Sequence, residues 1–287
     1  MRISVNRRKS ASNKNKDSKE TMSFWEHLED LRRFLIRAII VIALFFVIIF
    51  INKDVFFTKI ILAPKETWFF TNAFLCRMSE TLSIKVICIN AVPLKLINIQ
   101  IAGQFTAHIL VSLIGAMVLS FPFILWQLWI FAKPALYAEE IKKVKGFIAI
   151  CSFLFFTGVL FAYFIIIPLA LNFLGTYQVS PSVENTISLM SYISTVSLIS
   201  LAMGLVFQLP VLVFFLTRIG LLTISLLKKN RKIVFVIILI LSAIITPPDV
   251  FSQLLVAFPL YVLYEISILI CKKTDEKNIA QSTSNVI

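Results

Sequence analysis

The sequence predicts an all-α integral membrane protein that crosses the bilayer six times as one bundle, with both termini on the cytoplasmic side. The chain has 287 residues, 59% of them hydrophobic, and the hydrophobic residues come in long uninterrupted runs. Trp and Tyr stand near the ends of such runs, which is typical of the membrane–water interface. Lys and Arg gather in alternate connecting segments, and this asymmetry sets the orientation of membrane helices.

The N-terminal segment is expected to be a retained tail. Residues 1–21 are basic and polar, and we expect them to be a disordered cytoplasmic tail. The apolar run that follows is long for a signal-peptide core, and no small-residue cleavage pattern comes after it. Residues 22–33 have polar and apolar faces at helical spacing, so they predict a surface helix that continues into the first membrane helix. Residues 22–271 then form the membrane domain, and 272–287 a cytoplasmic tail.

Six apolar segments are long enough to be assigned as membrane helices, although the last two are short. Proline within or at the ends of the later segments predicts kinks at Pro168, Pro210 and Pro259. The predicted spans are 34–51, 107–131, 147–168, 193–217, 233–246 and 250–270. The segment 233–246 covers only about 20 Å as a helix, less than the ~30 Å hydrocarbon core, so the bilayer must thin there or the helix must lie in a recess.

The basic residues fix the predicted orientation. With the N-terminus inside, 22 of the 28 Lys and Arg residues lie in cytoplasmic segments and 6 lie outside, all in the loop 52–105. The net charge of +13 is therefore explained by loop sidedness, and a nucleic-acid partner is not expected. The same outer loop contains Cys76 and Cys88, twelve residues apart on the oxidising side of the membrane. A disulfide and two free thiols are equally compatible with that spacing.

The sequence lacks the motifs of common enzyme and cofactor sites. It contains no Walker A loop, GxSxG, HExxH or paired CxxC motif, and it has only two His residues, His27 and His108. A lone His at these positions is more often an interfacial residue than a ligand. We therefore expect no enzymatic activity, no cofactor and no bound metal.

Four carboxylates face the cytoplasm beside many basic residues. Glu29 and Asp30 lie on the predicted surface helix, and Glu139 and Glu140 lie in the loop after the second membrane helix. Local ion pairs, such as Asp30 with Arg33, would account for them. The alternative is a cation-binding patch made from two parts of the chain, since guanidinium groups bind carboxylates in a bidentate fork.

Two polar residues occur within or beside the later membrane segments. Gln208 stands two residues before Pro210, where it would either satisfy a carbonyl freed by the proline or contact a partner helix. Asp249 lies in the turn between the two short helices. It is either the N-cap of the last helix or a carboxylate with a mechanistic role.

Five motifs occur in an order that resembles one known family. They read FWEHLEDLRRFL, FPFILWQLWIFAKPALYAEE, GVLFAYFIIIPLALNFL, GLVFQLP and ITPPDVFSQLLVAFPLYVLYEIS. Together they cover most of residues 22–271 and resemble TatC, the six-helix core subunit of the twin-arginine protein translocase. The two short final helices are similar to the cupped bundle of that family.

The resemblance implies a signal-peptide receptor in the membrane and no covalent chemistry. Such proteins bind the twin-arginine signals of folded substrates at the cytoplasmic face and recruit single-span partners of the TatA and TatB type. They form homo-oligomers within the complex, and transport draws on the proton-motive force. The implied signal-binding residues are Asp30, Arg32 and Glu140, with Glu29 and Glu139 beside them. The implied contacts with partner helices are Gln208, Pro210 and Phe131, and the implied mechanistic or structural residues are Pro64, Asp249 and Gln253.

The sequence departs from the family pattern at several places. Asp30 replaces the commoner Glu, and Gln208 stands where many members have Glu, so no ionisation is available there. The outer loop is long and carries both Cys76 and Cys88, which is similar to one bacterial lineage and favours a bacterial inner membrane over an organelle membrane. A small-molecule secondary transporter is the alternative function, but the chain shows neither the repeated halves nor the midplane charges that are typical of that class.

Overall fold

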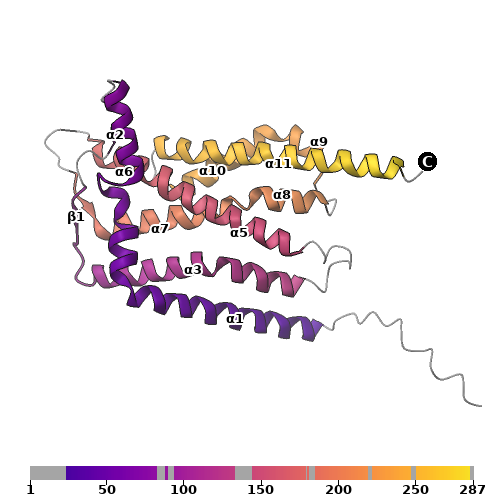
Figure 1. Ribbon diagram of the computed structural model, residues 1–287, viewed down its shortest axis with the longest axis horizontal. Coiled ribbons are helices and arrows are strands. Elements are labelled where there is room, and N and C mark those ends of the chain that lie inside the picture. The colour runs from indigo at the N-terminus through magenta and orange to yellow at the C-terminus, as the bar shows by residue number, and fades with distance from the viewer. Residues whose placement is uncertain are drawn as a thin grey trace, which may run out of the picture.

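The long helices of the protein run side by side and are connected at their two ends (Figure 1). The computed structural model describes residues 24–82, 88–89, 94–132, 144–178, 180, 185–218, 222–246 and 250–284, so the predicted tail at 1–21 lies outside the described residues. The main helices are α1 (Phe24–Ile51), α3 (Gly103–Ala132), α5 (Val144–Phe161), α6 (Ile167–Thr176), α7 (Leu189–Val206), α8 (Leu209–Arg218), α10 (Arg231–Ile245) and α11 (Val250–Ser284). The shorter elements are the π-helices η1 (Asp54–Ile61) and η5 (Ala162–Ile166), the 3-10 helix η2 (Ala63–Lys65), the helices α2 (Phe70–Leu82) and α9 (Ile224–Lys229), and the strands β1 (Leu96–Ile97) and β2 (Ile187–Ser188).

Five described stretches are long and apolar enough to cross a bilayer. They are Leu28–Ile51, Gly103–Phe131, Gly146–Thr176, Leu189–Thr217 and Val250–Cys271. The remaining predicted span corresponds to α10, whose 15 residues cover about 22 Å and so fall short of the ~30 Å hydrocarbon core. The all-α membrane class is confirmed, and α10 is short as predicted, but it does not have the length to cross an unthinned bilayer upright.

Several boundaries differ from the prediction. The predicted third helix was to end at Pro168, but the chain stays helical through η5 and α6 to Thr176. Pro168 has no N–H for the carbonyl of Phe164 four residues earlier. The hydroxyl of Thr71 in α2 donates a hydrogen bond to that carbonyl instead. The helix thus continues past the proline, and a side chain that is distant in sequence supplies a donor to the freed acceptor.

The predicted fourth and sixth helices also differ from the structure. The fourth is divided into α7 and α8 by a turn at Phe207 and Gln208, directly before Pro210. The proline cannot donate to the carbonyl of Val206, so the regular hydrogen-bond ladder stops there. The sixth was to end at residue 270, but α11 continues to Ser284, with Pro259 inside it. Part of the segment assigned to the C-terminal tail is thus helical.

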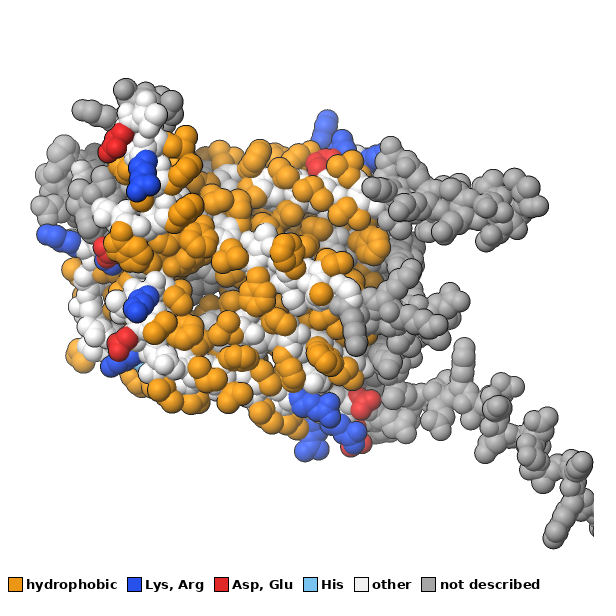
Figure 2. All heavy atoms as spheres, in the orientation of Figure 1, with side chains coloured by type: hydrophobic (Ala, Val, Ile, Leu, Met, Phe, Trp, Pro, Cys, Tyr) orange, Lys and Arg blue, Asp and Glu red, His pale blue; other side chains and the backbone are white. Residues whose placement is uncertain are grey.

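Helix α7 is the central element of the bundle. It packs against α3, α5 and α10, while α1 packs on α3, and α11 packs on α8 and α10. The core contains large side chains with no exposed surface, among them Phe155, Ile193, Ile199, Met203 and Val256. The outward faces are also apolar, and Figure 2 shows hydrophobic side chains covering the middle of the molecule between groups of Lys and Arg at the two ends. An apolar belt of this kind is expected where the solvent is lipid.

Glycine allows α5 and α7 to approach closely. A Cβ atom added at Gly158 would lie 2.6 Å from the carbonyl oxygen of Met203 and 2.7 Å from Cγ of Phe207. One added at Gly204 would lie 2.7 Å from Cε2 of Phe155 and 2.8 Å from Cγ2 of Val159. Small residues at a membrane helix interface let the two backbones meet, and here each helix supplies one.

The two ends of the bundle have different structures. The start of α1 and the end of α11 lie at one end, whereas α2, α6 and β1 lie at the other (Figure 1). At that second end β1 pairs in parallel with β2, with Leu96 opposite Ile187 and Ile97 opposite Ser188. The pairing connects two outer loops that are far apart in the sequence. Both described termini therefore share one end, as the predicted orientation requires.

Candidate functional site

The first predicted site residues lie on the exposed first turns of α1. The guanidinium of Arg33 donates to the Glu29 carboxylate at 2.6 Å and lies 3.8 Å from the Asp30 carboxylate. Both pairs follow helical spacing, at i,i+4 and i,i+3. The Glu29 and Arg33 side chains are 59% exposed and that of Asp30 is 37% exposed, so each pair contributes at most about 1 kcal/mol. The local ion pair predicted between Asp30 and Arg33 is therefore present, but it is weak enough for a cationic ligand to displace.

The end of α3 lies next to this part of α1. The rings of Phe34 and Phe131 stack with their centroids 6.3 Å apart, one helical turn after Asp30. On the other side of α3, Trp129 contacts Phe147 of α5 at 5.7 Å. The loop that carries Glu139 and Glu140 begins directly after α3. Those two residues lie outside the described part of the chain, so the predicted patch remains a prediction. The first turns of α1, which carry Glu29 and Asp30, do lie beside the end of α3, where the loop begins.

Basic side chains dominate the same end of the bundle. They include Arg32 and Arg37 on α1, both exposed, and the exposed Lys228 and Lys229 of α9. Arg231 at the start of α10 donates to Glu265 of α11 at 2.8 Å, and the hydroxyl of Tyr261 donates to the same carboxylate at 3.2 Å. Glu265 is thus engaged in joining α10 to α11. The side chains of Glu29 and Asp30, by comparison, are 59% and 37% exposed, so solvent reaches both carboxylates.

Gln208 contacts a neighbouring helix. Its side-chain amide donates to the carbonyl of Cys151 in α5 at 3.1 Å, and Pro210 behind it is buried. The amide thus joins the α7–α8 turn to α5 within this chain. The acceptor is therefore the carbonyl of Cys151 and not that of Val206, which Pro210 leaves without its helical donor. A contact with a partner helix stays a prediction.

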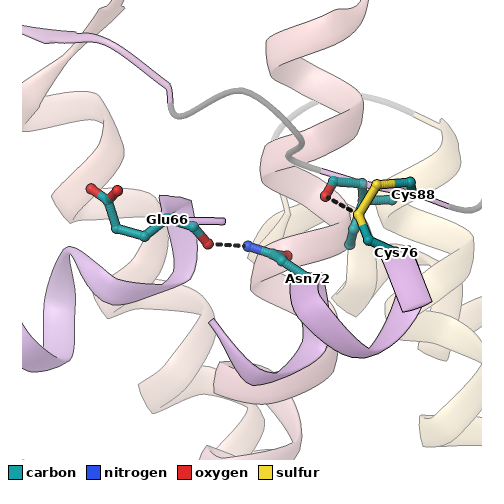
Figure 3. Close-up of a disulfide and its surroundings, with 5 residues drawn as sticks. Glu66, Asn72, Cys76 and Cys88 are labelled. Atoms are coloured by element: carbon teal, nitrogen blue, oxygen red, sulfur yellow. Dashed lines mark hydrogen bonds between the residues drawn. A yellow bond between two sulfur atoms is a disulfide. The ribbon is translucent and has the colours of Figure 1, made fainter. Parts of the chain in front are cut away.

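Pro64 belongs to a buried polar cluster at the opposite end. The side-chain amide of Asn72, which has no exposed surface, donates to the carbonyls of Pro64 at 3.1 Å and Glu66 at 2.7 Å. Figure 3 shows Asn72 pointing toward Glu66, with Cys76 of the disulfide about one turn further along α2. Cys76 and Cys88 are joined in that disulfide, and the backbone carbonyl of Ile89 lies beside the Cys76 sulfur. The outer loop is therefore held by one covalent and two hydrogen-bonded connections.

The last predicted residues lie on and near α11. The side-chain amide of Gln253 donates to the carbonyl of Leu239 at 3.0 Å, which ties α11 to α10. Asp249 lies outside the described residues, so neither its capping role nor a mechanistic role is tested. The structure does not bring Gln253 together with the carboxylates of α1, which lie at the other end of the molecule.

A set of side chains that the sequence patterns do not reveal attaches the outer loop to the bundle. The hydroxyls of Tyr163 and Tyr192 donate to the carbonyls of Ile60 and Ile61 at 2.7 and 2.8 Å, and so satisfy acceptors at the end of η1. Thr71 acts in the same way on the carbonyl of Phe164, whereas the bonds of Asn72 stay within the outer loop. The available signal was a tyrosine within an apolar run, since a buried tyrosine usually finds a partner for its hydroxyl. The identity of the partner depends on contacts 93 to 131 residues away in sequence.

Comparison with known proteins agrees with this architecture. The profile of the family described as Sec-independent protein translocase protein (TatC) matches residues 26–259. The chain is 39% identical over 257 residues to the TatC protein of Blattabacterium sp. subsp. Periplaneta americana, covering 89% of this chain and 97% of that one. It is 34% identical over 263 residues to TatCy of Bacillus subtilis, covering 92% and 93%.

Solved structures show the same fold. A crystal structure of the twin arginine translocase receptor TatC in DDM superposes with a TM-score of 0.68 at 32% identity, over 85% of this chain and 99% of that chain. A second crystal structure of this receptor gives a TM-score of 0.64 at the same identity, over 86% and 98%. A profile match over most of the sequence, relatives of nearly equal length and a shared helical bundle lead to one conclusion: the chain belongs to the TatC family of Sec-independent protein translocase proteins.

Proposed function

We propose that this protein is a membrane-embedded receptor for twin-arginine signal peptides and the core of a complex that exports folded proteins with the proton-motive force. The family match over residues 26–259 is the observation that carries the proposal. The open carboxylates on α1 supply the chemistry, because an arginine pair needs acceptors that it can reach from water. A secondary transporter is not supported, since the chain belongs to a family of protein translocase components.

The signal-binding site in this proposal consists of Asp30 and Glu140, with Arg32, Glu29 and Glu139 beside them. The stacking of Phe34 on Phe131 supports it, since it places the start of α1 next to the end of α3. Each arginine of the signal forms a charge-assisted hydrogen-bonded pair with one carboxylate. No covalent step is involved, so the protein is not an enzyme.

The proposed partners are single-span proteins of the TatA and TatB type, together with further copies of this chain. Gln208, Pro210 and Phe131 are the proposed contacts with partner helices, and Pro64, Asp249 and Gln253 the proposed mechanistic or structural residues. The proposed location is the inner membrane of a bacterium. The bond of Gln208 to Cys151 engages part of the amide, so a partner helix would contact its remaining polar surface or the kink beside it.

Signal binding is tested by photo-crosslinking a twin-arginine signal peptide to the protein in membrane vesicles, with probes beside Asp30 and Glu140. Changing Asp30→Ala or Glu140→Ala removes a charge-assisted bond, so we expect peptide affinity to fall about 10- to 100-fold. Glu80→Ala, an exposed carboxylate at the other end of the protein, is the control and keeps full affinity. Crosslinks should vanish when the arginine pair becomes a lysine pair. Unchanged affinity in both variants would refute the assignment.

Arg33 provides a sharper test of the same geometry. Its guanidinium occupies the carboxylates of Glu29 and Asp30 that the signal must reach. Replacing Arg33→Ala removes an internal competitor whose pairs contribute at most about 1 kcal/mol each, so affinity for the signal peptide should rise up to about fivefold. The measurement is a titration with a fluorescent peptide at low salt. A clear loss of affinity would show that Arg33 supports the site and does not compete for it.

A further inference from the structure

A large pocket lies at the end of the bundle opposite the start of α1. Its volume is about 1080 Å³, and its walls come from η1, the segment around β1 and the first turns of α3. The signal-binding carboxylates lie at the other end of α1, so the proposed function leaves this pocket without a role. It is also lined by basic side chains, which the orientation rule does not explain, because Lys and Arg are normally scarce on the outer side of a membrane.

The charge of the pocket is positive. Lys53, Lys65 and Lys95 reach it from three separate segments, and Asp54 is the carboxylate among the described lining residues. Lys65 pairs with Glu66, but no ion pair of Lys53 or Lys95 is found within the described residues. Like charges that converge on one cavity repel each other, and an anion bound between them relieves that repulsion.

Two amides and an imidazole also line the pocket. Asn98 and Gln104 line it with side-chain amides, and His108 lines it from the second turn of α3. The His108 ring is stacked on Phe50 with the centroids 4.0 Å apart, and its buried Nε2 has no hydrogen-bond partner among the described atoms. A buried nitrogen without a partner is unfavourable, and a ligand oxygen or hydroxyl would supply one.

The remaining wall is apolar and faces the membrane span of α3. Phe57, Leu94 and Phe105 line the pocket, and Phe105 is 61% exposed. An apolar wall does not stabilise a free inorganic anion, because such an anion is bound by opposite charge and hydrogen bonds. A phospholipid has both a charged phosphate and an apolar chain, and this end of a membrane helix lies at the depth where the two meet.

We propose that this pocket binds the phosphate headgroup of an anionic phospholipid of the outer leaflet. Lys53 and Lys95 contact the phosphate, His108 meets a headgroup oxygen, and Phe105 packs against the first part of an acyl chain. The bound lipid joins η1 to the segment 94–98 and so stabilises the outer loop. The site is separate from signal binding and does not depend on the proposed function.

Native mass spectrometry of the purified full chain tests the proposal, with phosphatidylglycerol and phosphatidylcholine as probes. Wild-type protein should bind one phosphatidylglycerol at least tenfold more tightly than phosphatidylcholine. A lysine near a membrane surface contributes about 1 kcal/mol toward an anionic lipid. The double variant Lys53→Gln/Lys95→Gln should therefore bind phosphatidylglycerol about thirtyfold more weakly.

The matched control is Lys59→Gln/Arg77→Gln, which removes the same charge from exposed outer residues that do not line the pocket. It should keep wild-type affinity, and the double pocket variant should keep wild-type affinity for the signal peptide. An equal loss of phosphatidylglycerol affinity in both double variants would show that net charge alone causes the effect, and it would overturn the proposed site. Competition by millimolar inorganic phosphate with no lipid preference would show a phosphate site and overturn the lipid assignment. Phe105→Ala should weaken lipid binding while leaving any phosphate binding unchanged.

Discussion

Asn72 is a single residue on which the outer loop depends. Its side-chain amide donates to the backbone carbonyls of Pro64 and Glu66, and the residue has no exposed surface. Asn72→Ala leaves these acceptors without that donor, and each unsatisfied buried group costs about 1 to 3 kcal/mol. We expect the free energy of unfolding, measured by denaturant titration in detergent, to fall by about 2 to 4 kcal/mol.

The control for Asn72 comes from the same helix. Thr81→Ala removes a hydroxyl that bonds to the carbonyl of Arg77 at an exposed position, and the change should stay within about 0.5 kcal/mol. Asn72→Asp keeps the volume but loses the donors, so it should be at least as harmful as Asn72→Ala. If Asn72→Asp retained wild-type stability, the donor role assigned to this amide would be wrong.

Single residues also show how far the sequence alone can be taken. The pairs of Arg33 with Glu29 and Asp30 were predictable in kind, because helical spacing brings residues three and four apart together. The role of Asn72 was not predictable, since nothing local distinguishes a buried asparagine from a surface one. Gln208 is intermediate, because its polarity in an apolar helix signals a partner, but the sequence does not reveal that the partner is Cys151.

The contact between α5 and α7 is determined by two glycines. A methyl group at either position would meet atoms closer than 3 Å, including the backbone oxygen of Met203, which moves only if the helices separate. Gly158→Ala and Gly204→Ala should each lower the unfolding free energy by about 1 to 3 kcal/mol. Gly146→Ala in the same α5 meets nothing within 4 Å and should be neutral or stabilising by up to about 1 kcal/mol. Equal effects of Gly146→Ala and Gly158→Ala would show that helix propensity matters here and close packing does not.

The membrane helices were predictable in type, but their ends were not. Hydrophobic run length identified the five stretches that are long enough to cross a bilayer, since a span must be apolar throughout. Kinks were expected at both Pro168 and Pro210, yet the chain behaves differently at the two prolines. The freed carbonyl before Pro168 accepts a hydrogen bond from the Thr71 hydroxyl and the helix continues, whereas a turn at Phe207 and Gln208 interrupts the helix before Pro210. The difference depends on a residue 93 positions away, which no local pattern contains.

The orientation of the whole molecule follows from charge, and the native cysteines make it measurable. Cys151 and Cys271 are buried, and Cys76 and Cys88 are bonded, so the wild-type protein should react little with a membrane-impermeant maleimide. Lys229→Cys at the end of α9 should then label only from the cytoplasmic side, and Lys59→Cys in η1 only from the outer side, since the predicted orientation puts these two segments on opposite sides of the membrane. Reducing the wild type first should add two reactive thiols, accessible only from outside. Labelling of Lys59→Cys from the cytoplasm would show that the predicted orientation is wrong. The carboxylates of α1 would then lie on the side of the membrane opposite to the one on which a signal peptide is presented.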